Sequence, residues 1–340
     1  MKKFLLMLLV MALCVAQGAG PALGAAVAQG DAVPAQGDAV GGQGAVEGAA
    51  VAQGDAVGGA RFTDALGNDV VLSGTPKRVI ALLGSFAEAY TLAGGTLVGT
   101  TEDAVSERAL PLGEGVQIIG KTQSPNLELI LALEPDFVIL SAETKEHRGI
   151  GDKLAQMGVA CAYFSVTRWA DYLDMCDKLC RVTGRPDLYE AQVAQVKKPI
   201  EEILARAKAN PNYGKKTALL LRAFSTGVKV KGSDNLTGAM LADMGLVNIA
   251  DSEQTLMENL TMEEIIQQDP DYIFVATMGA SEEKAMKALA ENLTNNPAWA
   301  GLRAVKEGRF VVLDKRLFHY KPNARWAQSY VFLEDLLYGE

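Results

Sequence analysis

The chain has 340 residues, with 32 lysines and arginines against 41 aspartates and glutamates, and a formal net charge of −9. This length leaves room for one large domain or two of medium size. An acidic chain without a cluster of lysines and arginines is a poor match for nucleic acid or an anionic membrane surface, so we expect no nucleic-acid partner.

The start of the chain is typical of a secretory signal peptide that ends near residue 26. Lys2 and Lys3 precede an apolar run over Phe4–Ala16, and small residues follow. The run is shorter than the roughly 20 residues that cross a bilayer. Cys14 leaves lipid attachment open, although Leu13 stands where a small residue is usual. We therefore expect an exported protein, periplasmic or tethered on the outer side of the cytoplasmic membrane.

Residues 27–60 are rich in alanine, glycine, valine and glutamine, and Ala-Gln-Gly-Asp-Ala-Val begins at Ala28, Ala35 and Ala52. A segment of this composition buries too little apolar surface to offset its ordering entropy. It is predicted to be a flexible tether.

Residues 61–185 are predicted to form an N-terminal α/β lobe, because short apolar strands alternate with helical patterns. The predicted strands are Arg78–Leu83, Thr96–Gly99, Gln117–Gly120, Phe137–Leu140 and Val159–Phe164, and the predicted helices are Phe86–Ala93, Asn126–Leu133, Gly151–Met157 and Trp169–Thr183.

A long helical pattern over Asp187–Ala209 lies in a linking segment, 186–212, and Pro199 predicts a kink in it. Alternation then resumes in a C-terminal lobe, residues 213–340. Its predicted strands are Thr217–Leu221, Tyr272–Val275 and Phe310–Leu313, and its predicted helices are Thr237–Met244, Glu263–Gln268 and Arg325–Leu337.

Two segments repeat one pattern 135 positions apart, Asn126–Ile139 and Thr261–Phe274. Each places a glutamate seven residues before a Pro-Asp pair that opens an apolar strand. We therefore expect the fold class α/β, with two Rossmann-like lobes joined by a single long helix.

With this organisation, residues 62–338 resemble the helix-linked class of periplasmic solute-binding proteins of ABC importers, which includes cobalamin-binding and ferric-siderophore-binding members. The resemblance rests on short stretches in the same order and spacing, namely Phe62–Gly67, Pro76–Ala81, Ser85–Glu88, Asn126–Glu128 with Pro135-Asp136, Asn296–Trp299 and Ala304–Arg309. It implies a ligand cleft between the two lobes, little hinge closure and an ABC permease as partner. It also implies that Glu128 and Glu263 dock on the permease, where two carboxylates would set the register.

Ligands of two-lobed α/β proteins bind at the carboxyl ends of strands. Arginines there suit the oxygens of a chelate, and aromatic side chains suit its bulk. His319 could be an axial ligand of a bound metal complex, and we expect no other metal role. The candidate ligand-binding residues are Ser85, Glu102, Arg222, Phe224, Met278, His319, Tyr320 and Arg325.

The chain has only two histidines, and His147 lies in a polar stretch, which argues against an importer of bare zinc. The predicted function is capture of an iron chelate of the siderophore type, with cobalamin or haem binding as the alternative. A hydrolase that uses Ser85 and His319 is a weaker alternative, because the flanking glycines of a nucleophile elbow are missing. We therefore predict no enzyme and no cofactor.

Three cysteines follow residue 60: Cys161, Cys176 and Cys180. An odd number at irregular spacing is not a disulfide framework. Cys176 and Cys180 share a face of one predicted helix, and we interpret them as small buried apolar residues.

Overall fold

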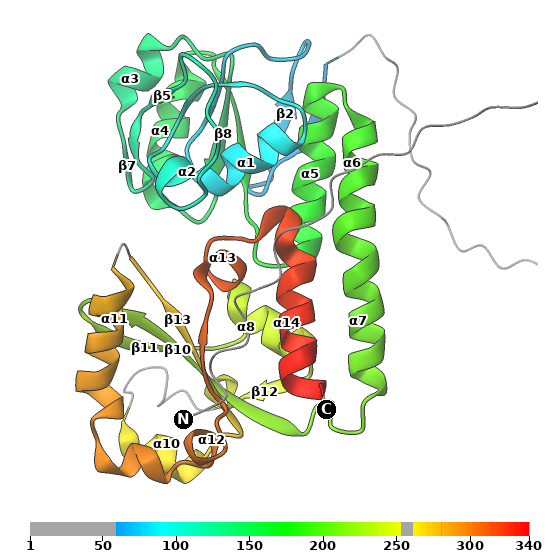
Figure 1. Ribbon diagram of the computed structural model, residues 1–340. Coiled ribbons are helices and arrows are strands. Elements are labelled where there is room, and N and C mark those ends of the chain that lie inside the picture. Colours follow the sequence, from blue (N-terminus) through cyan, green and yellow to red (C-terminus); the bar gives the residue numbers. More distant parts are fainter. Residues whose placement is uncertain (1–58, 253–260, 280, 340) are drawn as a thin grey trace, which may run out of the picture. The chain divides into compact units, whose positions relative to one another are not determined.

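The computed structural model describes residues 59–252, 261–279 and 281–339, which belong to one unit spanning Asp55–Glu340 (Figure 1). The predicted signal peptide with Cys14, and the predicted tether up to residue 58, lie outside the described residues. None of the helices described is both long and apolar enough to cross a membrane.

The first lobe contains a five-stranded sheet in which all neighbouring strands are parallel. Alternate residues of its central strand belong to two different apolar clusters. Val79 and Ala81 belong to one cluster, and Ile80 belongs to the other. Both faces are therefore buried, which explains the uninterrupted apolar runs in the sequence. In sheet order the strands are β5 (Gln117–Ile118), β4 (Leu97–Thr100), β3 (Val79–Ala81), β8 (Phe137–Ser141) and β9 (Ala160–Phe164).

Two short antiparallel pairs accompany this sheet, β1 (Arg61–Thr63) with β2 (Asp69–Val71) and β6 (Gly120–Lys121) with β7 (Ser124–Pro125). The helices of the lobe are α1 (Gly84–Leu92), α2 (Asp103–Ser106), α3 (Leu127–Ala132), α4 (Lys145–Gln156) and α5 (Trp169–Thr183).

The predicted start of α4 at Gly151 was wrong, because the helix begins six residues earlier, at Lys145. Its buried stripe is His147, Ile150 and Leu154. The stripe has helical spacing, but its first member is a histidine in a charged segment, so the apolar pattern becomes visible only at Ile150.

The two lobes are connected by α6 (Pro186–Gln192), a π-helical turn (Val193–Lys197) and α7 (Lys198–Ala209), which follow one another without a break. The predicted fold class, two α/β lobes joined by a long helix, is confirmed. The π-helical turn ends two residues before Pro199, which has no N–H to donate to the preceding turn. The predicted domain boundaries stay a prediction.

The second sheet has the same alternation, since Leu219 and Leu221 enter one apolar cluster and Leu220 another. Strands β10, β12, β13 and β14 pair in parallel, whereas β11 is antiparallel to β10. The strands are β10 (Lys216–Phe224), β11 (Gly227–Lys231), β12 (Leu246–Asn248), β13 (Tyr272–Thr277) and β14 (Phe310–Leu313).

The predicted end of β10 at Leu221 was wrong, because the strand continues to Phe224 and turns back tightly into β11. Phe224 pairs with Gly227, so only two residues form the turn. Pairing with β11 keeps Arg222 in the strand, although the sequence placed it in the loop that follows.

The predicted closing helix, Arg325–Leu337, is confirmed to within one residue at either end by α14 (Trp326–Tyr338). The α-helices described in the second lobe are α8 (Leu236–Asp243), α10 (Met262–Gln268), α11 (Glu282–Leu289), α12 (Arg303–Lys306), α13 (Lys315–Phe318) and α14. Shorter turns are the 3-10 segments Ile249–Asp251, Pro297–Gly301 and Asn323–Arg325, and the π-helical segment Ala290–Thr294.

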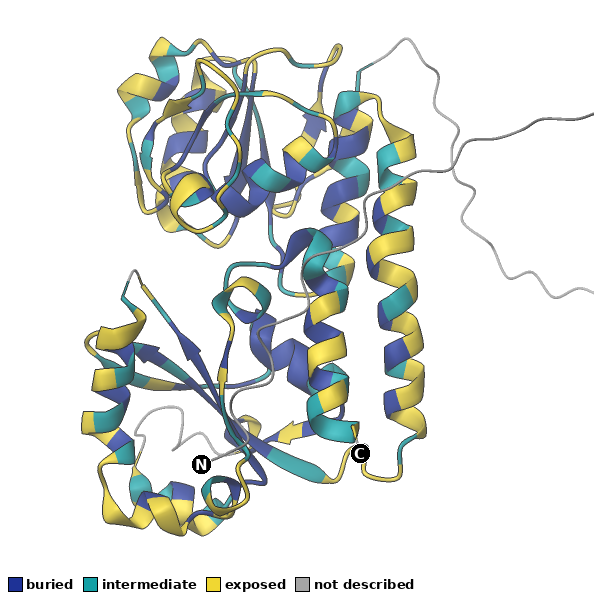
Figure 2. Cartoon of the chain, viewed as in Figure 1, coloured by how far each residue is buried: buried dark blue, intermediate teal, exposed yellow. Residues whose placement is uncertain are grey.

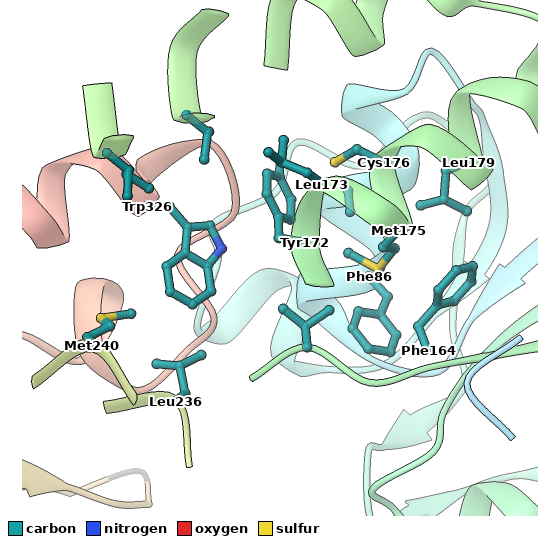
Figure 3. Close-up of a cluster of buried hydrophobic side chains, with 14 of the residues drawn as sticks. Phe86, Phe164, Tyr172, Leu173, Met175, Cys176, Leu179, Leu236, Met240 and Trp326 are labelled. Atoms are coloured by element: carbon teal, nitrogen blue, oxygen red, sulfur yellow. The ribbon is translucent and has the colours of Figure 1, made fainter. Parts of the chain in front are cut away.

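One apolar cluster extends through both lobes (Figures 2 and 3). It includes Phe86 of α1, Tyr172 and Cys176 of α5, Met240 of α8 and Trp326 of α14. Separating the lobes would expose apolar surface at a cost of roughly 25 cal/mol per Å². We therefore expect only small relative movements of the lobes.

The prediction that Cys176 and Cys180 are buried is confirmed, whereas Cys161 is partly exposed. All three are free thiols. Burial raises the pKa of Cys176 to about 12 and that of Cys180 to about 11, so both are protonated at neutral pH.

Candidate functional site

The carboxylate of Glu88 on α1 joins the two lobes. Asn323 Nδ2 donates to Glu88 Oε2 at 2.6 Å, and Arg325 Nη1 donates to Oε1 at 3.3 Å, both from the second lobe. Arg108, from the first lobe, pairs with the same carboxylate and is almost wholly buried. Two guanidinium groups therefore share one carboxylate where the lobes meet.

The residues of the second lobe that contact the first lobe at Glu88 and Arg108 belong to one segment, Tyr320–Arg325. Lys321 and Asn323 have left-handed backbones, with φ of 52° and 54°, a conformation that costs a non-glycine residue energy unless its surroundings hold it. Arg108 donates to the carbonyl oxygens of Tyr320 and of Lys321, the latter at 2.9 Å. Lys321 Nζ in turn donates to the carbonyl oxygen of Val166 at 2.8 Å. These contacts to the first lobe hold the segment in place.

Several buried polar atoms at the ends of strands have no hydrogen-bond partner among the residues that the structure describes. Thr101 Oγ1 and Asp103 Oδ1 follow β4, Thr277 Oγ1 ends β13, and Arg222 Nε lies near the end of β10. A buried unpaired polar atom costs roughly 1–3 kcal/mol, and such atoms mark places where water or a ligand binds. Their position agrees with a ligand site at the carboxyl ends of the strands.

Positive charge gathers at His319. Burial, together with the charges of Arg222, Lys315 and Lys321, lowers the pKa of His319 to about 4. The imidazole is therefore neutral at physiological pH. Within the described residues Arg222 and Lys315 form no ion pair. Burial also lowers the pKa of Arg222, a shift that Asp234 partly offsets.

Five of the eight predicted ligand-binding residues lie in two groups, one around Glu88 and one around His319. The other three belong to neither group. Ser85 is buried, and its carbonyl oxygen accepts from Asn323 Nδ2 at 2.7 Å, so it lies beside Tyr320 and Arg325 around Glu88. Arg222 and His319 form the second group.

The remaining three predicted residues are Glu102, Phe224 and Met278. Glu102 is exposed at the start of α2, and Phe224 ends β10. The backbone N–H of Met278 donates to the carbonyl oxygen of Ala223 at 2.8 Å. In the described part of the chain, no hydrogen bond or ion pair joins these three side chains to either group.

A hydrolytic Ser85–His319 pair has no support in the geometry. The Ser85 hydroxyl and the His319 ring share no hydrogen bond within the described ranges. A nucleophilic serine needs a base within hydrogen-bond reach, and the ring of His319 packs instead against Tyr320, with centroids 5.1 Å apart.

Glu128 and Glu263 are both exposed and hold the same place in their helices, second after the N-cap. The Asn126 side chain caps α3 by accepting from the N–H of Leu129 at 3.1 Å. The Thr261 side chain caps α10 in the same way. The structure thus gives the repeated sequence pattern the same local geometry in each lobe.

His147, which lies in a polar stretch of the sequence, is a core residue. It is fully buried, and its Nδ1 accepts from the N–H of Ser141 at 3.0 Å, while Nε2 lies 2.9 Å from the carbonyl oxygen of Thr122. Burial lowers the pKa of this histidine. No group of three or more potential metal ligands occurs among the described residues.

A pocket of about 290 Å³ lies away from the predicted site, between α7 and α14. Its lining includes the bidentate pair Arg206–Glu334, with contacts of 2.7 and 2.8 Å. None of the predicted ligand-binding residues lines it. The arginine in its wall is already paired with a glutamate, so the candidate ligand site is the group of polar residues between the lobes.

Sequence reasoning did not identify Arg108, Asn323 or Lys315 as part of the site, and it noted Glu88 only within a family stretch. Arg108 comes from a polar segment without an apolar pattern, and Asn323 lies 235 positions from Glu88. The one available signal was the Lys-Pro-Asn run at 321–323, which indicates an irregular backbone.

Comparison with known proteins agrees with this architecture. The family model described as "Periplasmic binding protein" matches residues 70–317, well over half of the chain. The Fe(3+)-citrate-binding protein YfmC of Bacillus subtilis is 28% identical over 250 residues, which cover 72% of this chain and 75% of the relative. The Fe(3+) dicitrate-binding periplasmic protein FecB of Escherichia coli is 25% identical over 276 residues. The match covers 74% of this chain and 88% of FecB.

Among solved structures, Staphylococcus aureus SirA complexed with staphyloferrin B superposes with a TM-score of 0.61. It is 22% identical, and the match covers 82% of this chain and 97% of SirA. At this identity the likeness is one of fold.

Proposed function

This chain belongs to the periplasmic binding protein family, and on that premise we propose that it captures an anionic ferric chelate with carboxylate donors and delivers it to an ABC importer. The observation that carries the proposal is the pair of cations at His319. Arg222 and Lys315 form no ion pair within the described residues, and Arg222 Nε is buried without a partner.

The net charge of the whole chain is −9, so its overall field repels an anionic chelate. Arg222 and Lys315 have no ion-pair partner among the described residues, although Asp234 and Glu107 act on them at longer range. Beside the neutral His319 they supply positive charge at one place. Guanidinium groups bind carboxylates through two parallel hydrogen bonds, which favours polycarboxylate chelates over neutral ones.

The similar proteins named for ferric citrate support this choice of ligand class. Haem and cobalamin remain the alternatives within the family. A neutral His319 could coordinate an open axial position of either. Cobalamin has no free carboxylate for Arg222 and Lys315 to pair with, whereas the two propionates of haem could pair with these cations, so the titration compares haemin directly with ferric citrate.

The test is calorimetric titration of the purified protein with ferric citrate, a neutral ferric trihydroxamate, haemin, cobalamin and zinc chloride. Saturable binding of ferric citrate at micromolar concentration or below, with weaker binding of the neutral chelate, is the expected result. Selective binding of haemin or cobalamin would replace the ligand class. Binding of zinc alone would overturn the chelate proposal.

We further propose that the protein acts outside the cytoplasm, binds without chemical change of its ligand, and docks on the permease through Glu128 and Glu263. Fractionation of cells that express the full chain would test export. Mass spectrometry of the mature N-terminus would distinguish lipid on Cys14 from ordinary cleavage.

A further inference from the structure

The carboxylate of Glu88 occupies the position between Arg108 and Arg325 that a carboxylate of a bound ligand could also occupy. Its oxygens accept from Asn323 and Arg325 of the second lobe and pair with Arg108 of the first. Guanidinium groups directed at one point from two lobes are a usual way to hold an external anion. Here the anion is part of the chain.

The two arginines are not saturated by this one carboxylate. Within the described part of the chain, Nε of Arg108 and Nε of Arg325 are both buried without a hydrogen-bond partner, as is Oδ1 of Asn323. Burial, together with the neighbouring charge of Arg325, lowers the pKa of Arg108 to about 9. Beside the Glu88 carboxylate lie one buried guanidinium group, that of Arg108, and one with a side chain 33% exposed, that of Arg325. Two positive charges against this one carboxylate leave donors for an anion that enters.

We propose that Glu88 is a specificity-determining residue: it occupies Arg108 and Arg325 in the empty protein, excludes small inorganic anions from them, and yields only to a ligand with several carboxylates. The inference rests on the proposed function for the ligand class. A monovalent or small anion gains too little from the arginines to displace a carboxylate that the fold holds in place. A polycarboxylate chelate also contacts other cations and so competes successfully.

Glu88 and an anionic ligand compete because both carry negative charge and both accept hydrogen bonds from Arg108 and Arg325. Glu88→Gln keeps the shape and one acceptor oxygen while it removes the competing charge. Affinity for ferric citrate should therefore rise by about tenfold or more, the range of a close charge interaction. The affinity of a neutral ferric trihydroxamate should change by less than about twofold.

A matched control is Asp243→Asn. Asp243 is likewise a partly buried carboxylate, and it accepts from Arg168 Nη1 at 3.1 Å and from the Tyr330 hydroxyl at 2.7 Å. It contacts neither Arg108 nor Arg325. If the effect of Glu88→Gln came from looser packing rather than freed arginines, Asp243→Asn would reproduce it.

The experiment is titration of wild type, Glu88→Gln and Asp243→Asn with ferric citrate and, separately, with inorganic phosphate alone. We expect tighter ferric citrate binding and new millimolar phosphate binding in Glu88→Gln only. Unchanged or weaker binding in Glu88→Gln, or an equal gain in Asp243→Asn, would overturn the inference. If Glu88→Gln does not fold by thermal melting, Glu88→Ser takes its place, and Glu88→Asp, which keeps the charge, should still exclude phosphate.

The phosphate titration separates this inference from the proposed function. Wild-type protein that binds no ferric carboxylate would refute the proposed ligand class. Phosphate binding by Glu88→Gln and not by wild type would still support the role of Glu88, and its absence would refute that role.

Discussion

Glu128 and Glu263 are equivalent residues of the two lobes, each the exposed second residue of a helix whose N-cap side chain closes the first turn. The equivalence continues after the helices, where Glu134 and Asp269 both have positive φ, 44° and 36°. Each precedes a Pro-Asp pair whose aspartate accepts from a backbone N–H at the start of the neighbouring strand or directly before it. Asp136 accepts from the N–H of Arg78 at 2.8 Å, and Asp271 accepts from that of Thr217 at 2.9 Å.

The first prediction concerns docking. Glu128→Ala and Glu263→Ala should each lower uptake by about tenfold or more, since a hydrogen bond between charged groups contributes roughly 1.5–3 kcal/mol. The affinity for ferric citrate should not change. Uptake of labelled ferric citrate by cells, and calorimetry on purified variants, measure the two quantities.

Glu146→Ala is the control for docking, because Glu146 is also the exposed second residue of a helix, α4, in the first lobe. All three changes remove a favourable helix-dipole contact of about 0.3–1 kcal/mol, so their thermal stabilities should be similar. Full uptake in both Glu128→Ala and Glu263→Ala, or an equal loss in Glu146→Ala, would contradict the docking assignment.

The second prediction concerns Arg222. Arg222→Gln should weaken ferric citrate binding by about ten- to a hundredfold, the range for loss of a charged hydrogen-bonding partner. Thermal stability should stay equal or rise, because the native guanidinium is buried without an ion pair in the described part of the chain.

Arg316→Gln is the control for Arg222→Gln. Arg316 is exposed on α13 and pairs with Asp314. Titration of both variants should show the loss in Arg222→Gln alone, and equal affinities would remove Arg222 from the site.

The third prediction concerns acid stability. His319 has a folded pKa of about 4, below the unfolded value of 6.5, so the unfolded chain binds the proton first. Stability is then greatest above pH 6.5 and falls as the pH drops toward 4. This one group should cost about 1–2 kcal/mol of unfolding free energy between pH 7 and pH 5.

His147 acts in the same direction, since burial lowers its pKa as well. The chain has no other histidine, so two variants separate the contributions. Denaturant melts at pH 7 and pH 5 should show a smaller pH dependence in His319→Gln and in His147→Gln than in wild type. An unchanged dependence in both would mean that the histidines are not responsible.

The fourth prediction concerns the thiols. Cys176 and Cys180 are buried and protonated, and the thiolate is the reactive form. Both should resist an alkylating reagent in the native protein at neutral pH and react on unfolding. Cys176→Ala should cost no more than about 1–2 kcal/mol and leave ferric citrate binding intact. Rapid native labelling would show that the helix opens or that the thiols have a chemical role.

Much of the fold could be predicted because local rules decide it. Short apolar strands buried on both faces, helices ending before Pro-Asp, and the repeated pattern at Asn126 and Thr261 are all visible within windows of about a dozen residues. The start of α4 and the hairpin to β11 were missed because a buried histidine and a strand pairing are set by tertiary contacts.

The sequence by itself determined the two lobes, the linking helix and the paired glutamates, since periodicity and turn chemistry act between residues close in the chain. Only the tertiary structure decided that Glu88, Arg108, Asn323 and Arg325 meet. These residues are up to 237 positions apart, and no local pattern marks them. Their meeting depends on the segment Tyr320–Arg325, whose strained backbone is held by contacts to the other lobe.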